Sequence, residues 1–213
     1  MLRLDTFADL TCPWCFVAEA RLDAVLEEAG LDEADLERYW QPFLLDPALP
    51  EVGEPWADFV ARTFGSHDRA AAMFDAVADA GREVGIAFRL AGMRRAPSTR
   101  RAHRLVLAAG ERGHALALRF FRAHFEDGLD LSDTDTLVRL AAEHGVDAAA
   151  VLATDAFDAD VDTARRAAAA LGLTGVPVVV FNRTLAVSGA QPAHVFRQAL
   201  AKATAGQAPN AGG

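Results

Sequence analysis

The chain has 213 residues, of which 52% are hydrophobic, and a formal net charge of -9. This length and composition suit a globular protein with one large core or two smaller intertwined ones. The acidic balance argues against general nucleic-acid binding, which requires a basic face. The first ten residues contain an arginine and two aspartates, and no later stretch approaches the roughly 18 apolar residues of a membrane span. We therefore expect a cytoplasmic protein with neither a nucleic-acid nor a membrane partner.

The first fifty residues predict a strand, a helix and a second strand. Residues 2–9 alternate in polarity as a strand does, and residues 13–29 carry apolar side chains at helical spacing, with Gly30 as a stop. Residues 37–45 fit a second strand. The following segment, DPALPEVGEP (46–55), is rich in proline and glycine and predicts a loop or boundary.

Residues 56–171 are alanine-rich and predominantly helical in pattern. The expected helices, most of them bounded by Gly, Ser or Asp, cover 56–64, 67–83, 98–111, 114–125, 133–143, 147–152 and 156–171, and the one candidate strand is 85–90. Strand patterns return at 178–181 and 184–187, around a turn at Asn182 and Arg183, and a last helix is expected over 192–202.

This order of elements predicts an α/β fold whose two ends build one sheet, because two strands alone are marginally stable. We expect residues 1–50 and 173–203 to form a sheet domain of βαβ and ββα parts, interrupted by an all-helical insertion over 51–172. The small, polar segment 204–213 is expected to be a disordered tail.

The only two cysteines, Cys12 and Cys15, stand in TCPWC at the expected strand-to-helix turn. If the helix begins at Pro13, the missing proline N–H costs nothing there and Cys12 becomes the N-cap. Unpaired N–H groups and the helix dipole then favour a thiolate, so we expect the pKa of Cys12 to fall moderately below about 8.5, opposed by Asp9 if it lies close. Cys15 follows one turn later, within reach of a disulfide.

Other uses of the cysteine pair fit the sequence less well. A zinc site needs four ligands, and no pair among the six histidines has the spacing of a common zinc motif, so no metal is expected. Chance placement of two core cysteines in this motif is improbable, and a reducing cytosol disfavours a permanent structural disulfide. Redox chemistry is therefore the preferred interpretation.

Arginine is concentrated in the middle of the chain. Residues 82–122 contain ten Arg and two Glu, and RLAGMRRAPSTRRAHR (89–104) contains six Arg and no acid. Two interpretations stay open: these arginines pair with an acidic neighbouring surface, or they build a site for an anionic ligand.

A proline that directly precedes a β-branched run, as in GVPVVVF, starts a strand or lies in a turn, where the Val176–Pro177 bond can be trans or cis. The chain also contains, in order, FADLTCPWCFVAEARL, QPFLLDPALPEVG, PSTRRAHRL and GLTGVPVVVFNRTLAVSGAQP. In these four segments it resembles the DsbA family of thioredoxin-fold oxidoreductases, specifically its cytoplasmic FrnE-like branch.

The resemblance implies a thioredoxin fold interrupted by a helical domain, with a cis proline at Pro177 facing the cysteines. Cys12 would be the exposed nucleophile and Cys15 the resolving thiol, while Val176 would offer backbone hydrogen bonds to substrate. The residues expected to contact substrate are Pro13, Trp14, Val176, Pro177, Ser98, Thr99 and His103. The chain departs from the family at Ser98, where Asn is frequent, and at Trp14, which replaces the His of strongly oxidising members.

His103 has two interpretations. With Ser98 as the helix cap, Thr99 and His103 share a helix face beside an apolar stripe, so His103 is either a solvated or core-edge histidine or a functional one. In the functional interpretation, a protonated His103 stabilises the Cys12 thiolate or orients a substrate carboxylate.

The predicted function is that of a thiol–disulfide oxidoreductase, working as reductase, isomerase or oxidase through a Cys12–Cys15 redox disulfide and without a bound cofactor. Its substrate would be a thiol or disulfide of a protein or small molecule, with glutathione as the candidate electron donor or acceptor. One alternative is a glutathione-dependent isomerase or transferase of the 2-hydroxychromene-2-carboxylate isomerase or kappa type, which typically carries Ser or Thr in place of Cys12. A non-catalytic peptide-binding or chaperone-like module is the third. The sequence does not set the oligomeric state.

Overall fold

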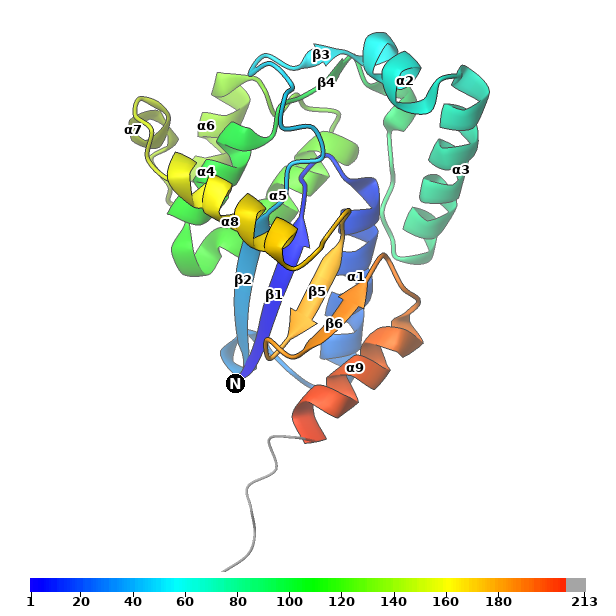
Figure 1. Cartoon of the computed structure of the whole chain (residues 1–213), viewed down its shortest axis with the longest axis vertical. Helices are drawn as coiled ribbons and strands as arrows, with labels where there is room; N and C mark the ends of the chain where they lie inside the picture. Colours follow the sequence, from blue (N-terminus) through cyan, green and yellow to red (C-terminus); the bar gives the residue numbers. More distant parts are fainter. Residues whose placement is uncertain (206–213) are drawn as a thin grey trace, which may run out of the picture.

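The structure is a computed structural model that describes residues 1–205, apart from the side chains of residues 67 and 91. Its main sheet has the strand order β2-β1-β5-β6, built from β1 (Leu2–Ala8), β2 (Leu36–Pro42), β5 (Val178–Phe181) and β6 (Leu185–Ser188). Strand β1 pairs in parallel with β2 and antiparallel with β5, and β5 pairs antiparallel with β6 (Figure 1). The expectation that both ends of the chain build one sheet is confirmed.

Helices cover both faces of this sheet. This cover is needed because successive side chains of a strand point to opposite faces, so that apolar side chains lie on both. On one face, Leu22 of α1 (Pro13–Glu28) and Phe196 of α9 (Ala193–Ala205) pack with Phe181 of β5. On the other face, Ala168 of α8 (Asp158–Ala170) packs with Phe7 of β1. The sheet is therefore the middle of three layers.

The segment between β2 and β5 is mainly helical, as expected. Its helices are α2 (Trp56–Phe64), α3 (His67–Glu83), α4 (Arg100–Ala108), α5 (Gly113–Phe125), α6 (Thr134–Ala142), α7 (Ala148–Leu152) and α8, and short 3-10 turns lie in it at Leu90–Gly92 and Gly110–Arg112. Another 3-10 turn, Glu33–Asp35, directly precedes β2. In Figure 1, α2 and α3 stand over one side of the sheet's upper end, and α4 to α8 over the other side.

Two expectations for this segment are wrong. Residues 85–90 form no strand: Gly85 has a positive φ of 77°, Ile86 is in the core, and the Arg89 N–H donates to the Phe125 carbonyl rather than to a strand. The short strands are instead β3 (Glu54–Pro55) and β4 (Arg95–Ala96), which pair with each other. Helix α4 begins at Arg100, so Ser98 is not its cap.

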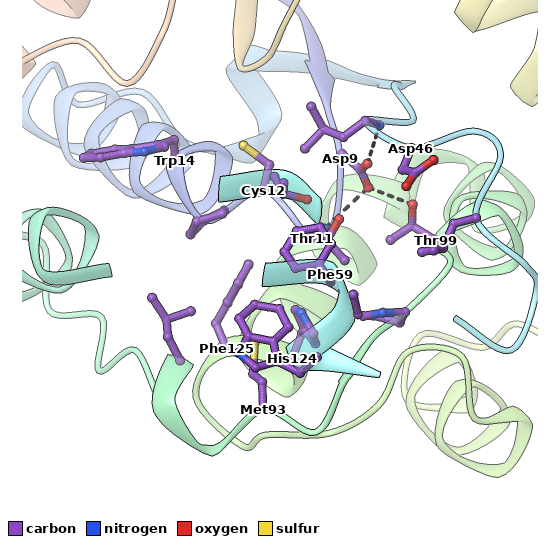
Figure 2. Close-up of a pocket in the computed structure, with 18 of the residues that line it drawn as sticks. Asp9, Thr11, Cys12, Trp14, Asp46, Phe59, Met93, Thr99, His124 and Phe125 are labelled. Atoms are coloured by element: carbon purple, nitrogen blue, oxygen red, sulfur yellow. Dashed lines mark hydrogen bonds between the residues drawn. The ribbon is translucent and has the colours of Figure 1, made fainter. Parts of the chain in front are cut away.

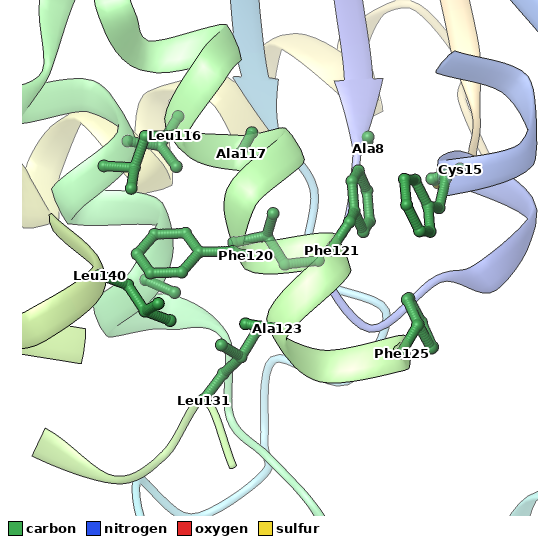
Figure 3. Packing of buried hydrophobic residues seen from close by; sticks show 14 of the residues in the cluster. Ala8, Cys15, Leu116, Ala117, Phe120, Phe121, Ala123, Phe125, Leu131 and Leu140 are labelled. Carbon is green, nitrogen blue, oxygen red and sulfur yellow. The ribbon is translucent and has the colours of Figure 1, made fainter. Parts of the chain in front are cut away.

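The core is continuous between the helical segment and the sheet. Phe121 and Phe125 of α5 stack against Phe16 of α1, with ring centroids 5.2 and 6.3 Å from that of Phe16. Figure 3 shows Phe121 pointing toward Ala8 and Cys15, and the neighbouring Phe120 pointing away into the helical segment. The boundaries at residues 50 and 172 therefore stay a prediction, since one hydrophobic cluster crosses them.

The C-terminal helix is longer than expected. Helix α9 ends at Ala205, because its last turn is held by the Asn182 side chain, which donates to the Ala203 carbonyl, and by Thr204, whose hydroxyl donates to the Leu200 carbonyl. Residues 204 and 205 are thus helical, and the rest of the predicted tail lies outside the described residues. Within residues 1–205, no helix is both long and apolar enough to cross a membrane.

Candidate active site

Cys12 is the N-cap of α1, as the sequence predicts. Its backbone is extended, Pro13 occupies the first helical position, and the Cys15 N–H donates to Cys12 Sγ at 3.3 Å. The sulfur therefore accepts one of the N–H groups that the first helical turn cannot satisfy internally. A thiolate at this position would face both this donor and the positive end of the helix dipole.

Cys15 lies one turn further along α1 and is completely buried. Burial raises the pKa of the Cys15 thiol well above its usual value, and the neighbouring Cys12 sulfur raises it further. Both cysteines are free thiols, and Cys12 lines the cavity described below, whereas Cys15 does not line that cavity. The two sulfurs thus differ in access.

Cys12 is less accessible than expected: its side chain is 5% exposed, so the prediction of an exposed nucleophile is wrong in that respect. The loop before β5 covers it. The Val176–Pro177 bond is cis, and the Cys12 thiol donates weakly to the Val176 carbonyl at 3.9 Å. The expected cis proline is therefore present, and Pro177 is buried behind Val176.

A buried carboxylate, Asp9, forms the floor beside the cysteine loop. Its oxygens accept hydrogen bonds from the Thr99 hydroxyl at 2.7 Å, the Leu45 N–H at 2.7 Å and the Thr11 N–H at 3.4 Å (Figure 2). Burial alone would raise the pKa of Asp9, but the His103 ring and the bonds from Leu45 and Thr99 hold it below its usual value. Asp9 is thus an anion at neutral pH, and it ties the cysteine loop to the start of α4.

His103 does not reach the cavity. Its ring is fully buried, its Nδ1 accepts a hydrogen bond from the indole of Trp40 at 3.1 Å, and its Nε2 lies 3.5 Å from Asp9. Because an indole N–H can only donate, His103 Nδ1 is the acceptor of this bond, and Nε2 is the ring nitrogen that faces Asp9. The structure therefore places His103 in the core behind Asp9, and gives no contact between His103 and Cys12 that would support the functional interpretation.

A cavity of about 590 Å³ opens above Cys12, between the sheet end and the helical segment. Four half-buried aromatic side chains of α2 and α3 line it: Trp56, Phe59, Phe64 and Phe74. Of the residues expected to contact substrate, the structure brings to this cavity Pro13, Trp14, Val176, Ser98 and Thr99, whereas Pro177 and His103 do not line it. Sequence reasoning missed the aromatic wall, although Trp56 and Phe59 stand at helical spacing.

The arginines of residues 89–104 do not line this cavity. Arg100 pairs with Asp158 and Asp162, and Arg95 donates to the carbonyls of residues 52 and 53. Arg104 donates to the carbonyls of residues 151, 154 and 156. The structure therefore favours the pairing interpretation of this stretch.

A second buried cluster of charges lies on α1, beyond Cys15. Glu19 is 1% exposed, its Oε2 lies 2.7 Å from His114 Nε2, and its Oε1 has no partner. Arg38 of β2 contacts the His114 ring at 2.8 Å and pairs with Asp23. Ligand atoms of Glu19, Asp23 and His114 lie within 4.8 Å of one another, but the Arg38 guanidinium supplies the cation. The cluster therefore fits an ion network that joins α1, β2 and α5, and sequence reasoning missed it.

Comparison with known proteins agrees with this geometry. The family model described as "DSBA-like thioredoxin domain" matches residues 3–201. A crystal structure of a probable DsbA oxidoreductase from Streptomyces coelicolor has a TM-score of 0.85 and 36% sequence identity, and it covers 98% of this chain and 92% of that one.

Two further proteins match over nearly their whole length. The uncharacterized protein YwbO of Bacillus subtilis (strain 168) is 26% identical over 209 residues, which is 93% of this chain and 96% of YwbO. The cytosolic disulfide reductase DsbM from Pseudomonas aeruginosa, solved with GSH, has a TM-score of 0.67 and 21% identity, covering 95% of this chain and 99% of that one. The likeness to DsbM concerns the fold.

Proposed function

Because the chain belongs to the DSBA-like thioredoxin domain family, we propose that it is a thiol–disulfide oxidoreductase of the FrnE-like type whose redox pair is Cys12 and Cys15. The observation that carries the proposal is the asymmetry of the two thiols. Cys12 caps a helix and lines a cavity, whereas Cys15 is buried one turn behind it. Nucleophilic and resolving roles require this difference in access.

In the first step of reduction, the Cys12 thiolate attacks one sulfur of a substrate disulfide. A mixed disulfide forms between Cys12 and that sulfur, and the other substrate sulfur leaves as a thiolate that takes up a proton. The Cys15 N–H, 3.3 Å from Cys12 Sγ, supports the attacking thiolate before the bond forms. Val176 lies beside the sulfur, where its backbone can align an extended substrate.

In the second step, Cys15 loses its proton and its thiolate attacks Cys12 Sγ. The Cys12–Cys15 disulfide forms and the second substrate sulfur leaves as a thiol, so the substrate gains the two electrons that the protein dithiol loses. Because burial raises the pKa of Cys15, its thiol stays protonated until the mixed disulfide has formed. An external dithiol, or two monothiols, then restores the reduced pair, and oxidation of a substrate dithiol runs through the same steps in reverse.

Single cysteine variants test this assignment. Cys12→Ser should abolish reduction of bis(2-hydroxyethyl) disulfide, and Cys15→Ser should accumulate a covalent mixed disulfide that intact-protein mass spectrometry detects as an added substrate half. Iodoacetamide should label Cys12 in the native dithiol protein before Cys15. If Cys12→Ser retains the exchange rate of the native protein, the redox assignment is wrong.

The two alternative functions give different results in the same variants. A glutathione-dependent isomerase or transferase would bind glutathione without forming an intramolecular disulfide, and Cys12→Ser would keep its activity. A peptide-binding module would bind an extended peptide equally well with either serine. Among residues 1–205, Arg62 is the one arginine that lines the cavity, and it is already paired with Asp46, which disfavours binding of glutathione, a ligand with two carboxylates.

The direction of the reaction follows from the reduction potential of the pair, measured by equilibration across glutathione buffers. A value near about -270 mV indicates a reductase, and one near about -120 mV an oxidant. We also propose a cytoplasmic location, supported by the likeness of fold to the cytosolic reductase DsbM and tested by cell fractionation.

A further inference from the structure

The cavity above Cys12 has a distinct chemical character. We infer that it selects small-molecule disulfides and thiols with an aromatic group and no negative charge, an inference that rests on the proposed redox function. A volume of about 590 Å³ falls within the range of about 300–1,000 Å³ typical of small-molecule sites. Large apolar side chains around a few fixed polar groups are the usual lining of such sites.

The aromatic wall consists of four rings from α2 and α3 that contact one another. Trp56 lies 5.1 Å from Phe59 and 5.7 Å from Phe74 by ring centroids, and Phe64 lies 6.0 Å from Phe59 and 5.7 Å from Phe74. All four side chains are half-buried in the free protein. Aromatic rings prefer stacked or edge-to-face partners at 4.5–7 Å, so the exposed faces of this wall suit a further aromatic ring.

Two further apolar side chains add to this wall. Met93 and Phe125 also line the cavity and lie on the same side of Cys12 as Phe59 in Figure 2, and a thioether packs well against ring edges. Trp14 lies on the other side of Cys12 in that view. A ring bound against Phe59 can thus carry its sulfur toward Cys12 without leaving apolar surroundings.

The charges of the lining act against anions. Asp9 and Asp46 contribute two carboxylates, and Arg62 is held by Asp46 at 2.6 Å and by Glu54. His124 is buried, and burial lowers its pKa, so it adds no positive charge at neutral pH. The lining carries a net negative charge, and a substrate carboxylate would meet like charge in partly dehydrated surroundings.

The test compares single-turnover rates of the reduced protein with three small disulfides, each divided by the rate of dithiothreitol with the same compound to remove intrinsic reactivity. The neutral aromatic probe is 4,4′-dithiodipyridine, the anionic aromatic probe is 5,5′-dithiobis(2-nitrobenzoate), and the neutral aliphatic probe is bis(2-hydroxyethyl) disulfide. We expect the normalised rate of the neutral aromatic probe to exceed each of the others by at least tenfold.

Single variants test separately the preference for aromatic probes and the discrimination against anionic probes. Phe59→Ala should lower the aromatic-to-aliphatic rate ratio about tenfold, while Phe157→Ala, at an exposed ring outside the cavity, should leave it unchanged. Asp46→Asn should raise the anionic-to-neutral ratio of the aromatic probes several-fold. Because these are ratios of rates within one variant, a loss of folded protein cancels.

The outcomes distinguish the inference from the function on which it rests. Rates that survive Cys12→Ser overturn the redox function itself. If the rates depend on Cys12 but the normalised rates of the three probes are nearly equal, only the inferred substrate class is wrong. The same holds if Phe59→Ala leaves the aromatic-to-aliphatic rate ratio unchanged. A peptide disulfide that reacts faster than the neutral aromatic probe after the same normalisation would also overturn the inferred substrate class, in favour of a protein substrate.

Discussion

Replacing Glu19 with glutamine should destabilise the fold strongly at neutral pH. The carboxylate is 1% exposed and lies 2.7 Å from His114, and the Arg38 guanidinium contacts the same ring. Removing one member of a buried ion pair costs about 3–5 kcal/mol, because the remaining charge loses compensation in the interior, although Arg38 keeps its pair with Asp23 in this variant. Glu19 Oε1 already lacks a partner in the native protein, which places the expected loss at the lower end, about 3 kcal/mol.

This loss should be visible as a shift in melting temperature. For a domain of 150–250 residues, each kcal/mol lowers Tm by about 2–4 °C, so Glu19→Gln should lower it by about 6–12 °C. The matched control is Glu28→Gln on the same helix. Glu28 pairs with Arg197, but both side chains are more than half exposed, so its replacement should leave Tm nearly unchanged.

The effect should depend on pH with a defined sign. Burial alone would raise the pKa of Glu19, but His114 and Arg38 hold it below its usual value. A carboxyl group whose pKa is lower in the fold contributes stability above its unfolded pKa, about 4.3, and loses it as pH falls through the folded value. The difference in free energy of unfolding between native protein and Glu19→Gln should therefore be complete at pH 7 and shrink below about pH 4.3.

Urea denaturation followed by tryptophan fluorescence, at steps from pH 7 to pH 3.5, measures this difference. An unfolding free energy for Glu19→Gln within about 1 kcal/mol of the native value at pH 7 would refute the reasoning, because it would mean that water reaches the cluster. A difference that does not change with pH would refute the assignment of the stabilisation to the ionised carboxyl.

Two further predictions concern the frame around the site. Phe121→Ala should lower the free energy of unfolding, measured by urea titration, by about 3–5 kcal/mol, because the Phe121 ring is fully buried and stacks on Phe16. A loss below about 1 kcal/mol would show that α5 and α1 do not share one core. Gly53→Ala should lower Tm more than Gly30→Ala does, because both glycines have a positive φ near 70° but only at Gly53 would a Cβ lie 2.3 Å from a backbone oxygen, that of Ala96. Equal losses in the two alanine variants would contradict that contact.

The elements closest to the cysteines were predicted well because their signals are local. Proline at the first helical position and an N-cap residue before it act within one turn, and α1 begins at Pro13 as expected. The glycine that ends this helix has the positive φ of 71° that its role requires. Strand β1 follows from alternation along a short segment and β5 from a run of β-branched residues, and neither signal needs knowledge of the partner strand.

The start of α4 shows where such signals fail. Ser98 carries the local pattern of a cap, but the helix begins at Arg100 and the hydroxyl of Thr99 instead donates to Asp9, which lies 90 positions earlier. A hydrogen bond to a distant carboxylate competes with local capping, and the sequence around Ser98 contains no sign of that partner.

The sequence by itself determined the cysteine motif, the helix that presents it, the two-ended sheet and the family resemblance, because each depends on neighbouring residues or on segments in a set order. Only the tertiary structure decided that Cys12 is covered, that His103 stands behind Asp9, and that the arginines pair with acids and carbonyls rather than line the cavity. These properties depend on which distant side chains share a space and how much water remains there. Burial and long-range pairing exist only once the chain has folded, and they set the access and charge of the site.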